Sequence, residues 1–149
     1  IAQPMEKTIL AMLEGRHWTL NKNKFTSLGK GTDIILINIA GDKKIINYLR
    51  FRALEALALF PTEKTANFLE RTIEKSFSAI ARRGFESFSR GFGKTKPYRV
   101  QKMALKLLKH PKKNIRISAA RFFRTKDELI FKKFIKTEND PWVRKEALK

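Results

Sequence analysis

The chain has 149 residues, of which 33 are Lys or Arg and 14 are Asp or Glu, so its formal net charge at pH 7 is +19. This length is sufficient for a hydrophobic core without disulfide or metal support. With 42% hydrophobic residues and 12 Phe, the composition excludes a wholly disordered chain. The absence of cysteine excludes disulfide bonds, zinc–cysteine sites and a thiol nucleophile. We therefore predict one compact domain over residues 1–149.

The longest apolar stretch, residues 34–40, is far shorter than the roughly 20 residues that cross a bilayer. We therefore expect no transmembrane segment. The first residues, Ile1, Ala2 and Gln3, suit a position just after a cleaved signal peptide and suit any other chain boundary equally well. A chain without cysteine suits either redox environment. Localisation therefore stays open, with the cytoplasm favoured over export.

Apolar residues recur at helical spacing through most of the chain. The amino-terminal elements that we predict are a helix over residues 5–14, an irregular loop or short hairpin over 17–27, and a helix over 33–40. Helix is favoured over strand for the last of these because Gly41 and Asp42 follow as a stop, and a lone strand would have no pairing partner. Residues 1–31 would then form an irregular cap in front of helical repeats over residues 32–149.

The remaining helices are marked by their ends. We predict them over residues 49–60, 62–75, 76–90, 98–109, 114–124 and 127–136, and from residue 141 onward. Pro61 ends the first of these helices, and Thr62, Asp127 and Asp140 are predicted N-caps. The glycine-rich residues 91–97 are predicted to form a loop. The apolar face predicted for the third helix consists of Phe77, Ile80, Ala81, Phe85 and Phe88.

A sequence pattern recurs in three of these helices: an apolar residue, Arg, two variable positions, Ala, and further apolar residues. The copies begin at Leu49, Ile115 and Val143, which are 66 and 28 residues apart, and a degraded copy begins at Ala81. The small Ala lets two helices approach closely, while the apolar positions pack between successive helical hairpins. The pattern therefore predicts a repeat protein.

The segment Asp140-Pro141-Trp142-Val143-Arg144 is similar to the loop-to-helix junction of HEAT repeats, and residues 111–116 are a looser version of it. The resemblance covers about residues 32–149. It implies an all-α fold, a short right-handed α-solenoid of three to four HEAT-like helical hairpins, which binds a partner along its surface without enzymatic activity. The uneven period and the missing acidic residue before Pro97 and Pro111 are departures that leave the repeat count open.

Positive charge is concentrated in the second part of the chain. Residues 1–75 hold 12 basic and 8 acidic residues, whereas residues 76–149 hold 21 and 6. Residues 82–126 contain 15 basic residues and a single acidic one, Glu86. Such repulsion disfavours a compact state unless an anion screens it, so we predict a binding surface for an acidic partner. Its expected residues are Arg82, Arg83, Arg90, Lys94, Lys96, Arg99, Lys102, Lys106, Lys109, Lys113, Arg116 and Arg124.

The helix over residues 98–109 is the expected centre of this surface. As the second helix of a hairpin, it would present Arg99, Lys102, Lys106 and Lys109 as a row on the concave side of the solenoid. Such a row suits an acidic protein, nucleic acid phosphates or, in peripheral contact, anionic lipid headgroups. We predict a scaffold for an acidic protein, with a nucleic-acid-binding module as the alternative.

A second alternative is a DNA glycosylase for alkylated bases. The chain is similar to the glycosylases built from HEAT-like repeats in its basic surface, with Trp142 and Asp140 as the aromatic and acidic residues. Asp140 is better explained as a helix cap. Phe85, Phe88 and Phe92 could stack nucleic acid bases, but their spacing favours core packing.

The sequence contains no motif for nucleotide binding, metal binding or acid–base catalysis. Residues 91–95 end like a phosphate-binding Walker A loop, but Phe88 stands where that motif needs glycine, and no buried strand precedes it. His17 and His110 are far apart and adjoin turns, so we expect no metal site and no catalytic pair. His110 at a helix C-terminus is expected to be favourable in its protonated form. No cofactor is expected.

Overall fold

The computed structural model describes residues 4–76 and 79–149, and these form ten α-helices and no strand. The predicted all-α fold class, built from successive helical hairpins, is confirmed. The chain divides into two compact units, residues 1–94 (unit 1) and 95–149 (unit 2), and each is described by itself. The single domain stays a prediction. Phe77, assigned above to an apolar helix face, lies outside the described residues.

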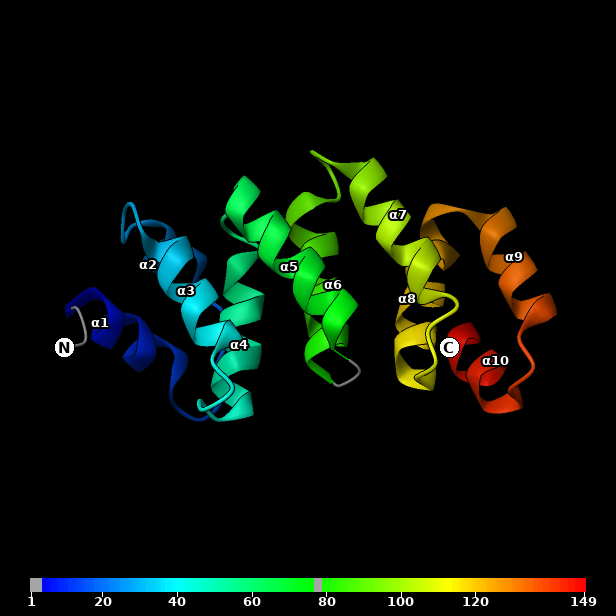
Figure 1. The fold of residues 1–149 in the computed structure, drawn as a ribbon, viewed down its shortest axis with the longest axis horizontal. Helices are drawn as coiled ribbons and strands as arrows, with labels where there is room; N and C mark the ends of the chain where they lie inside the picture. The colour runs from blue at the N-terminus through cyan, green and yellow to red at the C-terminus, as the bar shows by residue number, and fades with distance from the viewer. Residues whose placement is uncertain (1–3, 77–78) are drawn as a thin grey trace. The chain divides into compact units, whose positions relative to one another are not determined.

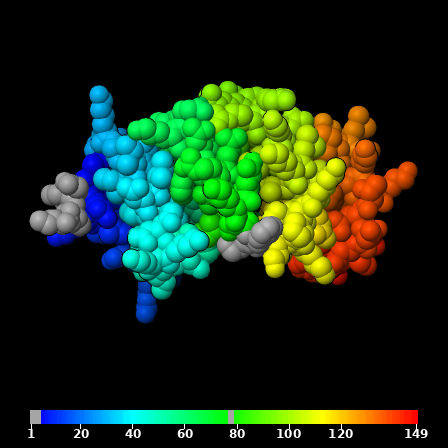
Figure 2. Space-filling model, viewed as in Figure 1, coloured from blue at the N-terminus to red at the C-terminus, as the bar shows by residue number. Residues whose placement is uncertain are grey.

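Unit 1 contains six helices: α1 (Pro4–Leu13), α2 (Lys22–Thr26), α3 (Thr32–Gly41), α4 (Asn47–Leu57), α5 (Glu63–Lys75) and α6 (Ala79–Phe92). Two hairpins, α3 with α4 and α5 with α6, form its body (Figure 1). The second helices, α4 and α6, pack on each other, and the first helices, α3 and α5, do the same. The all-atom view shows residues of the first hairpin bordering directly on those of the second (Figure 2).

The core of unit 1 follows from the apolar faces of these helices. Thr62 caps α5 as predicted, since its Oγ1 accepts a hydrogen bond from the Thr65 N–H at 3.2 Å. Leu54 on α4 and Phe88 on α6 are completely buried. Ser87, also buried, donates its hydroxyl hydrogen bond to the Leu54 carbonyl and so ties α6 to α4. The α4–α6 contact therefore combines apolar burial with a satisfied polar group.

Two predicted loops are wrong in part. Residues 22–26 form the short helix α2 instead of a loop or hairpin, because the Asn21 side chain accepts from the Lys24 N–H and Phe25 is buried. Helix α6 continues through Gly91 to Phe92, where a loop was predicted. The reason is tertiary, since Phe92 is fully buried and its ring centroid lies 5.4 Å from that of Phe88.

Unit 2 contains four helices: α7 (Pro97–Leu107), α8 (Lys113–Lys126), α9 (Glu128–Thr137) and α10 (Pro141–Leu148). Helix α8 packs against each of the other three (Figure 1). The predicted caps are confirmed: the Asp127 side chain accepts from the Ile130 N–H, and the Asp140 side chain caps α10. The core of unit 2 is therefore arranged around α8.

The repeated pattern falls on α4, α8 and α10, and its degraded copy falls on α6. In the three clear copies, the repeat arginine hydrogen-bonds a backbone carbonyl in the chain that leads into its own helix. Arg50 donates to Ala40 at 2.9 Å, Arg116 donates to His110 at 2.9 Å, and Arg144 donates to Glu138. Each arginine therefore ties its own helix to the end of the preceding helix or to the connection after it, which gives the repeat a structural explanation.

Candidate anion-binding sites

The structure divides the twelve predicted basic residues between the two units. Unit 1 holds Arg82, Arg83, Arg90 and Lys94, and unit 2 holds Lys96, Arg99, Lys102, Lys106, Lys109, Lys113, Arg116 and Arg124. The set is therefore described as two groups, each within its own unit.

In unit 1, two of the four residues have internal contacts. Arg82 forms an ion pair with Glu86 at 3.1 Å, one turn further along α6. The Arg83 guanidinium lies 5.2 Å from the centroid of the Phe51 ring, within the range of a cation–π contact. Arg90 and Lys94 are exposed.

In unit 2, the predicted row is present but its expected position is wrong. Helix α7 packs against the following helix, α8, and is therefore the first helix of its hairpin, not the second. Arg99, Lys102 and Lys106 follow one another at three- and four-residue spacing along α7, and Lys109 follows its end. The three lysines are exposed and Arg99 is half-buried. The row thus lies on one face of a first helix.

The α8 members of the predicted set make contacts within unit 2. Lys113 pairs with Asp140 at 2.7 Å, and Arg116 pairs with Glu138 at 2.8 Å. Burial by itself would raise the pKa of Glu138, but hydrogen bonds from Arg116 and from the Asp140 N–H hold that pKa below its ordinary value. These two cations therefore stabilise the packing of unit 2.

The two residues considered for glycosylase chemistry, Asp140 and Trp142, lie at the start of α10. The Asp140 Oδ1 atom accepts hydrogen bonds from the N–H groups of Trp142 at 2.8 Å and Val143 at 3.2 Å. A hydrogen bond from Lys113 is the main cause that holds the pKa of Asp140 below its ordinary value. Trp142 is 47% exposed. The carboxylate is occupied by cap and ion-pair contacts, as the helix-cap interpretation predicted.

The interpretation of His110 as a protonated group at a helix end is wrong. Its Nδ1 atom accepts a hydrogen bond from the Lys112 N–H at 3.0 Å, which requires that nitrogen to be unprotonated. Burial lowers the pKa of His110, and the charges of Arg116 and Lys112 lower it further. The structure therefore favours neutral His110.

Phe85, Phe88 and Phe92 are buried, so the core-packing prediction for them is confirmed. Among the residues that the structure describes, no group of three or more His, Cys, Asp or Glu side chains is placed to hold a metal ion. No helix within the described ranges is both long and apolar enough to span a bilayer.

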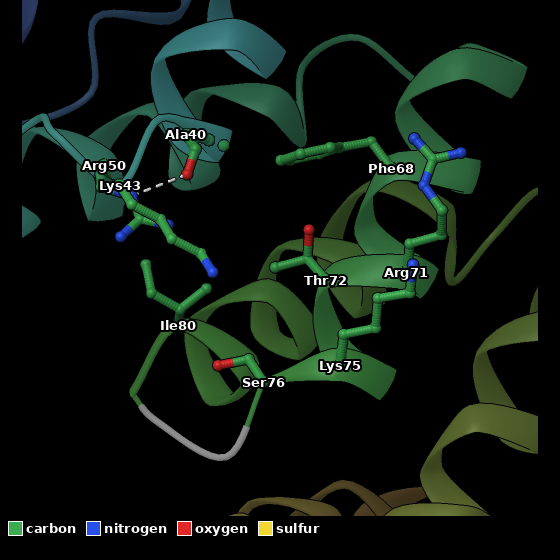
Figure 3. Close-up of a pocket in the computed structure, with 10 residues that line it drawn as sticks. Ala40, Lys43, Arg50, Phe68, Arg71, Thr72, Lys75, Ser76 and Ile80 are labelled. Carbon is green, nitrogen blue, oxygen red and sulfur yellow. Dashed lines mark hydrogen bonds between the residues drawn. The ribbon is translucent and has the colours of Figure 1, made fainter.

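A pocket of about 690 Å³ lies in unit 1, where α3 ends beside α4, α5 and α6 (Figure 3). No pattern in the sequence predicted this pocket. Four cationic side chains line it, namely Lys43, Arg50, Arg71 and Lys75, and no acidic side chain does so among the residues described. Lys43 and Arg50 lie on one side of the pocket, whereas Arg71 and Lys75 approach from α5 on the other (Figure 3).

The two α5 cations of this cluster, Arg71 and Lys75, leave no excess of positive charge in the sequence around them. Glu70 directly precedes Arg71 in the sequence, and Glu74 directly precedes Lys75, so the charges cancel when they are counted along the chain. Adjacent residues of an α-helix point about 100° apart. The two cations at i and i+4 therefore share a stripe that faces the pocket, and neither glutamate lines it.

Comparison with known proteins adds little. No protein-family model matches the chain, and no curated protein matches it. Among solved structures, the chain is similar to the complex of CpcE and CpcF of phycocyanin lyase from Nostoc sp. PCC7120, at 15% sequence identity and a TM-score of 0.41. The match covers 99% of this chain and 76% of that chain. The HEAT family therefore stays a resemblance, and what is established is an all-helical fold of hairpins.

The comparison corrects one expectation. The solved structure is named as a lyase, which is an enzyme. This contradicts our expectation, based on the resemblance to HEAT repeats, that the chain has no enzymatic activity. Architecture of this kind does not exclude catalysis.

Proposed function

We propose that this chain is a binding scaffold whose basic α7 face docks an acidic macromolecular partner, with a protein as the favoured partner. The observation that carries the proposal is the composition of α7, which has three exposed basic or hydroxyl-bearing positions, Tyr98, Lys102 and Lys106, and no acidic residue. Lys102, Lys106 and Lys109 are exposed in a segment, residues 95–113, that contains no Asp or Glu. A contiguous field of one sign raises the association rate with a partner of the opposite sign.

Apolar side chains on the same face favour a protein over a nucleic acid. Tyr98 is 77% exposed and Leu105 is 42% exposed. With Lys102 and Lys109 they occupy positions i, i+4, i+7 and i+11, which form one helical stripe. Protein interfaces combine an aromatic or apolar centre with a polar rim. Phosphate recognition needs the cations alone.

Nucleic acid is the second candidate because residues 76–149 hold 21 basic and 6 acidic residues. Binding to phosphates would fall steeply as salt rises. Anionic lipid headgroups would respond to salt in the same direction.

The test compares two charge-reversal pairs within unit 2. Lys102→Glu with Lys106→Glu changes the α7 face, and Lys132→Glu with Lys136→Glu makes the same charge change at the same spacing on α9. The ligands are a fluorescent peptide rich in Asp, Glu and aromatic residues, a duplex DNA and a single-stranded DNA, each at two salt concentrations. We expect the α7 pair to weaken binding of the acidic peptide about tenfold or more, and the α9 pair to weaken it much less.

A second variant separates the two candidate partners. Replacing Tyr98 and Leu105 with Ser should weaken peptide binding and leave DNA binding unchanged if the partner is a protein. Equal losses for the α7 and α9 pairs would show that only net charge matters, and would contradict a docking face on α7. Tighter binding of DNA than of the peptide, with a steep salt slope, would place nucleic acid first.

A further inference from the structure

We propose that the unit 1 pocket is a binding site for a small organic phosphate, a phosphomonoester joined to a flat apolar body. The site uses residues of α3, α4, α5, α6 and the connection after α3. It is independent of the proposed α7 face, because every residue that lines it belongs to unit 1.

The electrostatics of the pocket are those of an anion site. Among the described residues, Lys43, Arg71 and Lys75 take part in no ion pair, and Arg50 contacts only neutral oxygens of Ala40 and Asn47. Helices α3 and α5 end at the pocket, and each C-terminus contributes about half a negative charge. Together they offset about one of the four positive charges, so a net positive field remains for a ligand to neutralise.

The placement of Arg71 and Lys75 supports the same conclusion. Like charges at i and i+4 on a helix repel each other and destabilise it slightly. Both side chains are exposed, and both border the pocket from α5. A bound dianion between them would convert this repulsion into two charge-assisted interactions. Arg71 offers the paired N–H groups that suit phosphate oxygens, and the half-buried Thr72 hydroxyl faces the same space (Figure 3).

The remaining wall of the pocket is apolar. It includes Ala40, Phe68 and Ile80, each of which is otherwise buried. A Cβ atom at Gly41 would lie 3.2 Å from the Phe68 Cε1 atom, so the absence of a side chain at this position leaves room for the ring beside the end of α3. A volume of about 690 Å³ is typical of sites for small molecules. Charge on one side and an aromatic ring on the other therefore select an anion that carries a flat apolar body.

The experiment measures binding of three probes to the whole chain by isothermal titration calorimetry. The probes are 2-naphthyl phosphate, which has both features, inorganic pyrophosphate, which has only charge, and 2-naphthoate, which has a carboxylate in place of phosphate. The pocket variant is Arg71→Gln with Lys75→Gln. Its matched control is Lys145→Gln with Lys149→Gln, which removes the same charge from two exposed positions four residues apart in unit 2, outside the proposed α7 face. A single Lys43→Gln change in the connection after α3 gives a second variant that leaves every helix intact.

We expect 2-naphthyl phosphate to bind more tightly than either other probe. The pocket pair should weaken its binding about tenfold or more, Lys43→Gln should weaken it less, and the Lys145 and Lys149 pair should leave it unchanged. Equal losses for the two pairs, or no binding at millimolar probe, would overturn the proposal. Pyrophosphate binding as tightly as 2-naphthyl phosphate would overturn the apolar part, and 2-naphthoate binding as tightly would overturn the phosphate part. Failure here leaves the α7 proposal intact, since that proposal is tested by peptide and DNA binding.

Discussion

The two units use the same repeat arginine in different electrostatic settings. In unit 2, Arg116 forms an ion pair with Glu138, and the two side chains are 16% and 8% exposed. In unit 1, Arg50 donates to the carbonyl of Ala40 and borders a pocket without a carboxylate among the described residues. The same sequence feature therefore supports an internal ion pair in one unit and belongs to a cationic pocket in the other.

The difference shows that the net charge of a segment does not locate its uncompensated cations. The more basic part of the chain neutralises three cations of α8 with carboxylates that lie after or on the following helices. These pairs are Arg116 with Glu138, Lys113 with Asp140 and Arg121 with Glu146. The less basic part contains a pocket that four cations line without any carboxylate among the described residues. Pairing in space, not charge along the chain, decides which cations are available to a partner.

The largest effect is expected from breaking the partly buried ion pair of unit 2. The change Arg116→Met leaves the Glu138 carboxylate partly buried without its partner and removes the hydrogen bond to the His110 carbonyl. Loss of one member of a fully buried pair costs about 3–5 kcal/mol, so for this partly buried pair we expect the free energy of unfolding of unit 2 to fall by about 3 kcal/mol. Urea denaturation followed by Trp142 fluorescence, in a Trp18→Phe background, measures it.

The control for this change is Lys132→Met on α9. Lys132 pairs with Glu128, but the two side chains are 69% and 74% exposed. Exposed pairs contribute little to stability, so the unfolding midpoint should stay within error. A loss for Arg116→Met as small as that of the control would show that the ion pair does not stabilise unit 2.

A smaller effect is expected from the corresponding change in unit 1, Arg50→Met. It removes a charged hydrogen bond to the Ala40 carbonyl but leaves no buried carboxylate unpaired. A hydrogen bond to a charged group contributes about 1.5–3 kcal/mol. Trp18 fluorescence in a Trp142→Phe background reports on unit 1. A loss equal to or greater than that of Arg116→Met would remove the contrast between the two units.

Local signals predicted much of this fold, because helix caps act within one turn. Thr62, Asp127 and Asp140 cap the helices that follow them, as their sequence positions indicated. The end of α6 was misplaced because Gly91 suggests a loop when it is considered locally. Burial of Phe92 extends the helix instead, and burial depends on the packing of other helices.

The candidate sites were predictable only where one helix carries them. The spacing of Lys102 and Lys106 places both on one face of α7 without reference to any other element. The position of α7 in its hairpin depends on which neighbour it packs against, and our prediction that α7 is the second helix was wrong. The pocket of Lys43 and Arg71 forms only when residues far apart in the sequence come together, so no local pattern contained it.

A third prediction concerns backbone spacing within unit 1. A Cβ atom at Gly91 would lie 3.0 Å from both the Cα and the carbonyl oxygen of Ala58, so the backbone must shift to accept it. We expect Gly91→Ala to destabilise unit 1 by about 1–3 kcal/mol, as overpacking does, although alanine favours helix. At Gly84 the nearest atom is the side-chain Cγ1 of Ile73 at 3.3 Å, so a shift of a few tenths of an ångström relieves the contact. Gly84→Ala should therefore be nearly neutral, and equal effects at the two positions would contradict the close approach of α6 to Ala58.

The smallest effect is expected from the titration of His110, which belongs to unit 2. Burial, Arg116 and Lys112 lower its pKa below the ordinary value of 6.5, so folding favours the neutral form. The contribution of this group to stability is then complete above pH 6.5 and is lost as the pH falls toward the folded-state pKa, because the unfolded chain binds the proton more readily. Trp142-detected unfolding should show this decline between pH 7.5 and 5.5. His110→Asn keeps an acceptor for the Lys112 N–H but does not titrate, so it should flatten the decline, whereas His17→Asn in unit 1 should leave it unchanged. An unaltered pH profile in His110→Asn would show that other groups cause it.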